Sequence, residues 1–352
     1  MYDTSLFDVR TDLAIEETER QKKQGYPSYP GVSVDEYDHT DLSNNKGSIH
    51  VTTVRIQSEE SAHVLGKAMG TYITLEVPDM VQNDGHIHRE ISQVLAHYLQ
   101  DLLKSHFPVH KYSQTQQGLQ VLVVGLGNAD VTPDALGPRV LSHVLITRHL
   151  QNGSFQKPDF PIDSASVCGI VPGVMAQTGI ETAEIIKALT DQIHPDIIIV
   201  IDALAARSVT RLGTTIQLTD TGIHPGSGVG NHRHSLTQDS LGIPVIAIGV
   251  PTVVGAAAIV TDTLDTLIEV LCRETDTKHF ADALRSMAPD EKYTLVRELL
   301  EPRFGPMFVT PKDIDDTIKR VSFTISEGIN LALFGDVASH TQKESHQSSL
   351  QL

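Results

Sequence analysis

Two aspartates stand at the ends of the two most aliphatic segments of the chain. Asp134 follows the aliphatic run 121–124 after a glycine turn, and Asp202 ends the aliphatic run 197–201. Two carboxyl groups within hydrogen-bond reach cannot both ionise cheaply, so the pKa of one of them rises and the pair shares a proton. A pair of this kind can activate water and protonate a leaving amine. We therefore take Asp134 and Asp202 as candidate catalytic residues.

A metal site is a competing interpretation of the same two acids. With His224 they would supply two oxygen ligands and one nitrogen ligand, and positions would stay open for water. The spacing does not require this, because the three residues lie in separate loops. In a purely structural interpretation, Asp134 supports a helix start that Thr132 caps, and Asp202 caps a turn or pairs with Arg207. The residues alone leave these alternatives open.

Two glycine-rich turns could supply backbone amides to a site at this place. One contains Gly127 and Asn128, and the other runs from 222 to 230 and contains His224, Gly226, Ser227 and Gly228. A dinucleotide fingerprint needs a glycine where Asp130 stands, and the chain has no Gly-Lys-Ser/Thr phosphate loop. Ser227 lacks the Gly-x-Ser-x-Gly setting of a nucleophile elbow. We expect these turns to bind substrate or to stabilise an oxyanion.

The two aspartates can meet only if their aliphatic runs are parallel strands, because the carboxyl ends of parallel strands open onto one edge of a sheet. Residues 120–124 and 197–202 have the pattern of strands buried on both faces. Strand and helix patterns alternate from 120 to 271, which is typical of a parallel sheet covered by helices. We therefore expect an α/β protein, with three α/β/α layers and a mostly parallel central sheet.

The periodic segments form one large domain with polar ends. Residues 13–48 are polar and rich in turn-forming residues, so we expect a flexible N-terminal segment. Residues 49–339 are predicted to form a single α/β domain, and the polar residues 340–352 to form a disordered tail.

Composition excludes several classes of function. The chain of 352 residues has 27 Lys and Arg against 44 Asp and Glu, a formal charge of −17 that is spread along the sequence. This balance argues against direct nucleic-acid binding through the phosphate backbone. Cys168 and Cys272 form no paired motif, so we expect no disulfide. We find no signal peptide and no apolar run of membrane-spanning length, so we expect a cytoplasmic protein without membrane contact.

A short segment near the N-terminus has a pattern of its own. In Arg10-Thr11-Asp12-Leu13-Ala14-Ile15-Glu16 an acid precedes an apolar pair close to a terminus, where proteolysis concentrates. From composition alone it is the start of a short helix.

Several long motifs occur in the order found in one protein family. They are residues 125–138, 170–175, 201–208, 222–231 and 243–254. The start at 10–14 and the segment 309–312 extend the match, whereas 15–118 and the residues beyond 270 match loosely. On these motifs the chain resembles the germination proteases of spore-forming bacteria. Their length and order make the resemblance highly specific.

The resemblance implies an endopeptidase that degrades small acid-soluble spore proteins in the spore core when germination begins. It implies synthesis as an inactive zymogen, a homotetramer, and removal of a propeptide, residues 1–12, by self-cleavage. The family cuts after an acidic residue that precedes an apolar residue and Ala. The bond between Asp12 and Leu13 is therefore the expected processing site.

The resemblance also assigns the catalytic pair. The two proposed catalytic aspartates of the family correspond to Asp134 and Asp202. The fold resembles that of the hydrogenase-maturation endopeptidases, in which a Glu stands at the position of Asp134 and a metal is bound by an acid–acid–His set; His224 would be the histidine. The germination proteases resemble aspartate enzymes without a required metal, so we expect no metal and no cofactor. A metal-dependent endopeptidase and a non-catalytic peptide-binding protein stay as alternatives, and the motifs disfavour the second.

Overall fold

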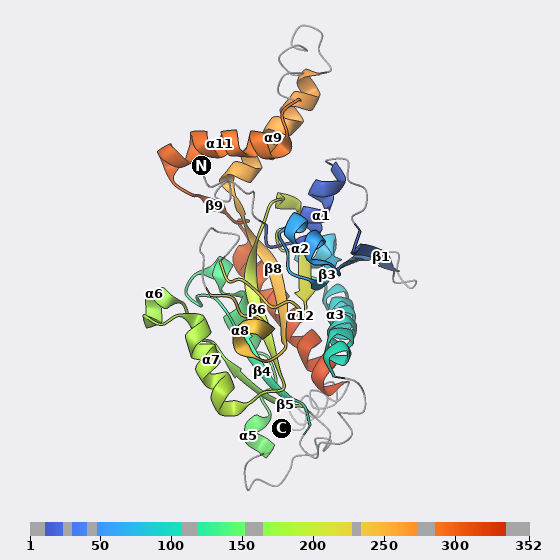
Figure 1. Cartoon of the computed structure of the whole chain (residues 1–352), viewed down its shortest axis with the longest axis vertical. Helices are drawn as coiled ribbons and strands as arrows, with labels where there is room; N and C mark the ends of the chain where they lie inside the picture. Colours follow the sequence, from blue (N-terminus) through green and yellow to red (C-terminus); the bar gives the residue numbers. More distant parts are fainter. Residues whose placement is uncertain are drawn as a thin grey trace, which may run out of the picture.

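A computed structural model describes residues 11–23, 30–40, 48–107, 118–151, 165–226, 234–272 and 286–335. One mixed sheet forms the centre, and helices cover both of its faces (Figure 1). The expected three-layer α/β/α fold is confirmed. No helix in these ranges is long and apolar enough to cross a bilayer.

The strands of the sheet lie in the order β1-β2-β3-β7-β8-β6-β4-β5, and β9 pairs with β8. Their bounds are Val32–Thr40 (β1), Ser48–Ile56 (β2), Gly70–Glu76 (β3), Gln120–Gly125 (β4), Ser166–Ile170 (β5), Ile197–Ala206 (β6), Thr215–Thr219 (β7), Val245–Gly255 (β8) and Phe308–Val309 (β9).

Only half of this sheet is parallel. Strands β8, β6, β4 and β5 run in parallel, as the alternation of strands and helices predicts. The contacts of β7 with β8 and β3, and those between β1, β2 and β3, are antiparallel. The expectation of a mostly parallel sheet therefore holds only for the half that carries both aspartates. The strands before residue 77 pair without crossover helices, and so they add an antiparallel half.

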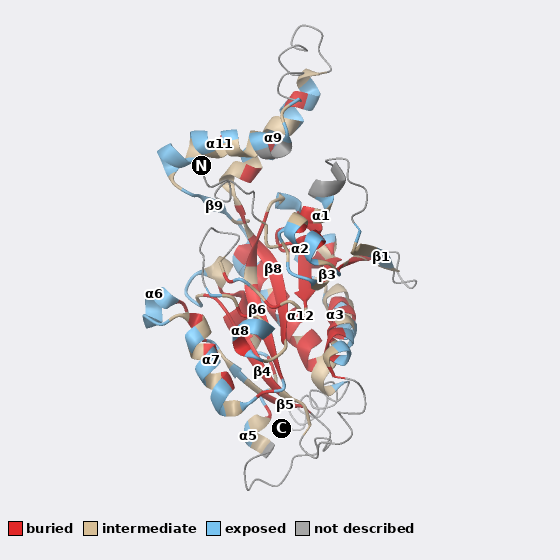
Figure 2. Cartoon of the chain, in the orientation of Figure 1, coloured by how far each residue is buried: buried red, intermediate tan, exposed pale blue. Residues whose placement is uncertain are grey.

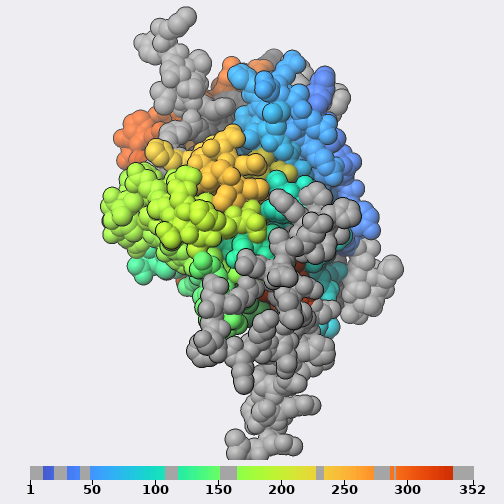
Figure 3. All heavy atoms as spheres, turned by 60° about the horizontal axis from the view of Figure 1, so that its bottom comes forward, coloured from blue at the N-terminus to red at the C-terminus, as the bar shows by residue number. Residues whose placement is uncertain are grey.

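Two apolar cores lie on opposite faces of the sheet. On one face pack α3 (Gly85–His106), α4 (Leu136–Leu141) and α12 (Ile314–Phe334). On the other face pack α7 (Thr182–Ile193) and α8 (Gln238–Leu241). All but one residue of each of β4 and β6 is buried (Figure 2), because both strands carry aliphatic residues on both sides. Figure 3 shows α7 and α8 side by side, and the Nζ of Lys187 lies 3.3 Å from the carbonyl oxygen of Leu241.

The remaining elements border the sheet. They are α2 (Glu59–Leu65), η2 (Pro78–Val81), η3 (Thr132–Asp134), α5 (Arg148–Gln151), α6 (Met175–Thr178), η4 (Val209–Arg211), α9 (Ala256–Leu271) and α11 (Pro289–Phe304). Helices α9 and α11 contact each other and extend beyond one end of the sheet (Figure 1). Lys292 of α11 and Asp265 of α9 form an ion pair at 2.7 Å.

The segment 13–48 was expected to be flexible, and this expectation is wrong where the structure describes it. Helix α1 (Ala14–Lys23) packs near β2, and β1 extends the sheet by one strand. Leu13, Ala14 and Ile15 are buried. Tertiary contacts therefore order a segment whose composition is polar, and local pattern does not reveal such contacts. The predicted tail, 340–352, lies outside the described residues.

Candidate active site

The two candidate aspartates lie at the carboxyl ends of neighbouring parallel strands. Gly125 at the end of β4 pairs with Ile201 of β6, and the amide of Leu126 donates to the carbonyl oxygen of Ile201 at 2.8 Å. Asp202 follows directly on β6. Asp134 ends η3, which contacts β6. The structure thus places both carboxylates at one edge of the sheet, as the aliphatic runs predict.

The glycine turn after β4 holds the carboxylate of Asp134. Its Oδ2 accepts a hydrogen bond from the amide of Asn128 at 2.7 Å. Gly127 has a φ of +108°. A Cβ atom there would lie 1.9 Å from the carbonyl oxygen of Asp134 and 3.0 Å from its Oδ1. Only glycine fits this backbone and this space, so the turn serves a close approach of β4 to η3.

The start of η3 differs from the predicted helix cap. Val131 occupies the N-cap position, and no side chain caps the turn. The Oγ1 of Thr132 instead donates to the Oδ1 of Asp315 on α12 at 2.8 Å. Since η3 is a single turn of three residues, Asp134 is positioned by Asn128 and the glycine turn, not by a helix of full length.

Asp202 is buried, with 6% of its surface exposed, and its Oδ1 accepts a hydrogen bond from the amide of Ala203 at 2.9 Å. The strand register aligns it with Gly249 of β8, which is aligned in turn with Gln217 of β7. Aligned residues of neighbouring strands project to the same face. Asp202 and Gln217 therefore face the same side, and the side chain of Leu204 packs over the glycine between them.

The predicted processing segment lies on this face of the sheet. The Oδ2 of Asp12 accepts a hydrogen bond from the amide of Ala205 at 2.9 Å, and the amide of Asp12 lies 3.4 Å from the carbonyl oxygen of Ala205. Leu13 has no exposed surface and packs in a cluster that includes Leu204 and Val254. The bond between Asp12 and Leu13 thus lies next to the strand that carries Asp202.

Two side chains donate to the carbonyl oxygen of Asp12. The Nζ of Lys67 is 3.2 Å from this oxygen and the Nε2 of Gln217 is 3.1 Å from it. The Oε1 of Gln217 accepts from the amide of Ala14 at 2.8 Å. Sequence reasoning missed both donors. Lys67 lies in a region that matches the family loosely, and Gln217 stands in a strand whose pattern gives it no distinction.

Glu16 anchors the segment through a buried carboxylate. Burial raises the pKa of Glu16, while hydrogen bonds from the side chain of Thr11 and the amide of Arg207, the charge of Arg211 and the amide of Ser208 act in the opposite direction. The amides of Arg207 and Ser208 donate to this carboxylate at 2.9 and 3.1 Å. The Nε of Arg211 lies 3.6 Å from it.

His224 lies on the turn after β7, where the charges of Lys67 and Asp12 act on it. Asp12 belongs to the segment 11–16, which we call the docked segment. Burial lowers its pKa most, the charge of Lys67 lowers it further, and the charge of Asp12 acts against both. A lysine beside this imidazole opposes the binding of a cation, and no three His, Cys, Asp or Glu side chains in the described ranges form a metal-binding group. These residues do not fit a metal site built on His224.

The second glycine turn is described only in part. Gly226, two residues after His224, has a φ of +74°, whereas Ser227 and Gly228 lie outside the described residues. The predicted role of this loop in substrate or oxyanion binding therefore stays a prediction.

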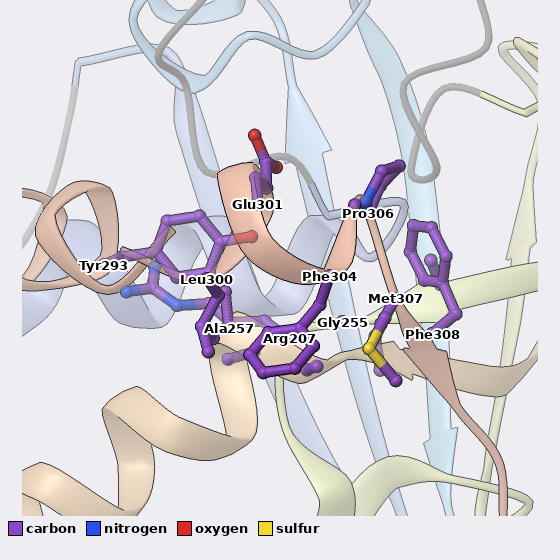
Figure 4. Close-up of a pocket in the computed structure, with 15 residues that line it drawn as sticks. Arg207, Gly255, Ala257, Tyr293, Leu300, Glu301, Phe304, Pro306, Met307 and Phe308 are labelled. Carbon is purple, nitrogen blue, oxygen red and sulfur yellow. The ribbon is translucent and has the colours of Figure 1, made fainter. Parts of the chain in front are cut away.

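A pocket opens where β6 ends, and residues of α9 and α11 line it as well (Figure 4). Ala205, which binds Asp12, is part of its lining, together with Arg207. Tyr293 and Phe304 of α11 also line the pocket (Figure 4). Ala205 thus belongs both to the lining of the pocket and to the contact with Asp12.

Comparisons with known proteins give one consistent answer. Residues 9–290 match the model of peptidase family A25, described as germination protease. A germination protease of Clostridium tetani is 46% identical over 326 residues, which are 92% of this chain and 95% of that protein. The germination protease of Bacillus subtilis is 38% identical over 370 residues, with 96% of each chain covered.

Similarity extends to solved structures. One of them is a hydrogenase maturation protease, HycI, from Thermococcus kodakarensis, at 15% identity and a TM-score of 0.28, covering 62% of this chain and 98% of that chain. This TM-score is too low to carry an argument, and the fold rests on the sheet described above.

Proposed function

This chain belongs to the germination protease family, and from that premise we propose that it is a zymogen that cleaves its own Asp12–Leu13 bond and then degrades small acid-soluble spore proteins. The family makes it a peptidase of spore germination. The self-processing, the substrates and the paired-aspartate chemistry are our proposal.

One observation carries the proposal. The segment with the acidic–apolar–Ala pattern lies on β6, where Asp12 binds Ala205 three residues beyond Asp202. The buried Leu13 fills an apolar site beside Leu204, as the residue after a cleaved bond would. A docked segment of this kind supports both a self-processing reaction and the expected sequence preference.

The two aspartates share the acid and base roles. Each carboxylate accepts a backbone hydrogen bond, Asp134 from Asn128 and Asp202 from Ala203. The ionised member of the pair takes a proton from water as the water oxygen bonds to the carbonyl carbon of Asp12. The protonated member donates its proton to the nitrogen of Leu13 as the C–N bond breaks.

The remaining properties of the proposed protein follow from its family. We propose a homotetramer in the cytoplasm of the spore core, without direct nucleic-acid binding and without a metal or other cofactor. Apolar side chains exposed at α11 and β9 supply a surface for contacts between copies; they are Leu295, Leu299, Phe304, Met307 and Phe308. Sedimentation of the purified chain tests the assembly.

The deciding experiment is intact mass and N-terminal sequencing of the purified chain during incubation at mildly acidic pH. A new N-terminus at Leu13, absent from Asp134→Asn and Asp202→Asn, is the expected result. Processing by either folded variant at the wild-type rate would dismiss the pair. Cleavage of a purified small acid-soluble spore protein by the processed chain, and not by either variant, tests the substrate assignment.

A further inference from the structure

Two hydrogen-bond donors from elements that are distant in the sequence contact the carbonyl oxygen of the proposed scissile bond. Lys67 comes from the turn between α2 and β3, and Gln217 comes from β7. Both side chains reach the carbonyl oxygen of Asp12 within hydrogen-bond distance. This oxygen gains negative charge when water adds to the carbonyl carbon, so donors placed there stabilise the transition state.

Gln217 holds both sides of the bond. Its amide nitrogen donates to the carbonyl oxygen of Asp12, and its amide oxygen accepts from the amide of Ala14. The side chain is buried, with 6% of its surface exposed. It projects from the same face as Asp202, across Gly249, where a Cβ atom would lie 2.5 Å from the side chain of Leu204. The glycine leaves space for the side chain of Leu204, which belongs to the same apolar cluster as Leu13.

Lys67 supplies positive charge to the same oxygen. Gly66 ends α2 in the left-handed conformation, with a φ of +59°, and the chain turns there toward the docked segment. The Nζ of Lys67 then contacts the carbonyl oxygens of Thr11, at 2.8 Å, and of Asp12. Burial lowers the pKa of Lys67, and the charges of Asp12, Glu17 and Glu16 act in the opposite direction and favour the ammonium.

We propose that Lys67 and Gln217 form the oxyanion-binding pair of this peptidase. The inference rests on the proposed cleavage at Asp12–Leu13 and deepens it. The amide of Asn128, which the sequence suggests for this role, donates to the carboxylate of Asp134 instead. The same pair would bind the carbonyl oxygen of the acidic residue in a substrate protein once the chain's own segment has left.

The reaction balances with this assignment. The water oxygen bonds to the carbonyl carbon of Asp12, and the negative charge on the tetrahedral intermediate faces Lys67 and Gln217. The C–N bond then breaks, the nitrogen of Leu13 takes a proton, and Asp12 gains a terminal carboxylate. Lys67 and Gln217 exchange no proton in either step and act through charge and hydrogen bonding alone.

The test compares self-processing rates of the full chain by intact mass. Gln217→Glu removes the donor but keeps an oxygen for the amide of Ala14, and Lys67→Met removes the charge but keeps the length of the side chain. Each is expected to slow release of residues 1–12 by about 10²- to 10³-fold, the cost of one oxyanion donor. Gln100→Glu and Lys187→Met are matched controls on α3 and α7, and they should process at the wild-type rate.

Hydrogen exchange of the segment 11–16 separates catalysis from docking. Slow processing with wild-type protection of this segment supports the pair, and processing within about threefold of wild type in both variants overturns it. If wild type releases residues 1–12 and Asp202→Asn does not, the proposed function stands whatever the two variants do. If wild type never cuts, or if Asp202→Asn cuts equally fast, the proposed function itself fails.

If Lys67→Met no longer binds the docked segment, its slow processing does not test the oxyanion role, and Lys67→Arg tests this role instead. An arginine keeps its charge at every accessible pH, whereas burial lowers the pKa of Lys67 below the ordinary lysine value of 10.5. The aspartate pair and Glu16 slow both proteins as the pH rises, so the test is the ratio of the two rates. The wild-type rate should fall relative to the rate of Lys67→Arg at alkaline pH. The groups that face Lys67 are Asp12, Glu16, Glu17 and His224. A ratio that does not change with pH contradicts the role of Lys67.

Discussion

The backbone amide of Ala205 lies 2.9 Å from the Oδ2 of Asp12. A main-chain donor on the strand of Asp202 thus recognises the acidic side chain that precedes the proposed scissile bond. This contact gives a physical reason for a preference for an acidic residue at that position, since a hydrogen bond to a charged acceptor is stronger than one to a neutral acceptor.

Asp12→Ala should therefore process more slowly than wild type. A hydrogen bond to a charged group contributes about 1.5–3 kcal/mol, which corresponds to about a 10- to 150-fold slower rate. Asp12→Asn keeps an oxygen acceptor for the amide of Ala205, so its processing rate should lie between those of wild type and Asp12→Ala. Intact mass over time measures all three rates, and equal rates for Asp12→Ala and Asp12→Asn would exclude this contact as the source of the preference.

Leu13→Ala should weaken docking of the segment. Leu13 is fully buried in its apolar cluster, and truncation of such a side chain costs about 2–5 kcal/mol. We expect faster hydrogen exchange across 11–16 and slower processing. Leu13→Met conserves volume and serves as the control, with a cost below about 1.5 kcal/mol. Unchanged exchange in Leu13→Ala would show that the apolar site does not hold the segment.

Glu16 should make docking depend on pH. Burial raises the pKa of Glu16 above its ordinary value of 4.5, so the docked state binds more protons than the unfolded state between these two values. Its contribution to stability is complete below pH 4.5 and is lost as the pH rises through the raised pKa. Urea unfolding from pH 4.5 to 8, in an Asp202→Asn background that stays uncut, measures this loss. In Glu16→Gln the free energy of unfolding should lack this pH-dependent contribution. If it fell equally steeply with pH in both chains, Glu16 would not be the source of the dependence.

Gly127→Ala should abolish catalysis in a folded chain. The added Cβ atom would lie 1.9 Å from the carbonyl oxygen of Asp134, and φ at this position is +108°. Asp134 must move, so we expect processing to fall by at least about 10²-fold. Gly242→Ala is the matched control, because Gly242 also has a positive φ, +76°, but nothing lies within 4 Å of its added Cβ atom. Equal processing by both variants would remove Gly127 from the site.

Removal of metal ions should leave processing unchanged. Burial and, after it, the positive charge of Lys67 lower the pKa of His224, and this charge opposes a cation at this place. Wild type is treated with EDTA, dialysed, and followed by intact mass with and without added zinc. A loss of processing that zinc restores would favour the metal-dependent alternative, with ligands that the described residues do not reveal.

Local pattern predicted the parts of the fold that depend on periodicity. The parallel strands β4 and β6, and the position of Asp134 and Asp202 at their ends, follow from two aliphatic runs, because a strand buried on both faces leaves little other choice. The resemblance to a known family, not the pattern, pointed to the bond after Asp12. The role of either aspartate in catalysis stays a prediction.

The contacts of the N-terminal segment could not be predicted in this way. Ala14 meets Gln217 across 203 positions of the sequence, and Lys67 meets Thr11 across 56. Neither partner carries a local signal, and α1 is polar apart from the few buried residues at its start. Such long-range contacts depend on how the antiparallel half of the sheet is placed beside the parallel half. The spacing of residues along a chain does not contain that information.

The anchoring of Glu16 has a consequence for the time after cleavage. Hydrolysis would detach Thr11 and Asp12, but Glu16 and Glu19 would still reach Arg211, and Leu13 would still lie in its apolar cluster. The new amino terminus would therefore remain as a bound product in the place that the next substrate needs. Cleavage of the bond and release of the new terminus from the site are then separate steps. We expect a lag between the appearance of the new terminus and the first cleavage of an external protein.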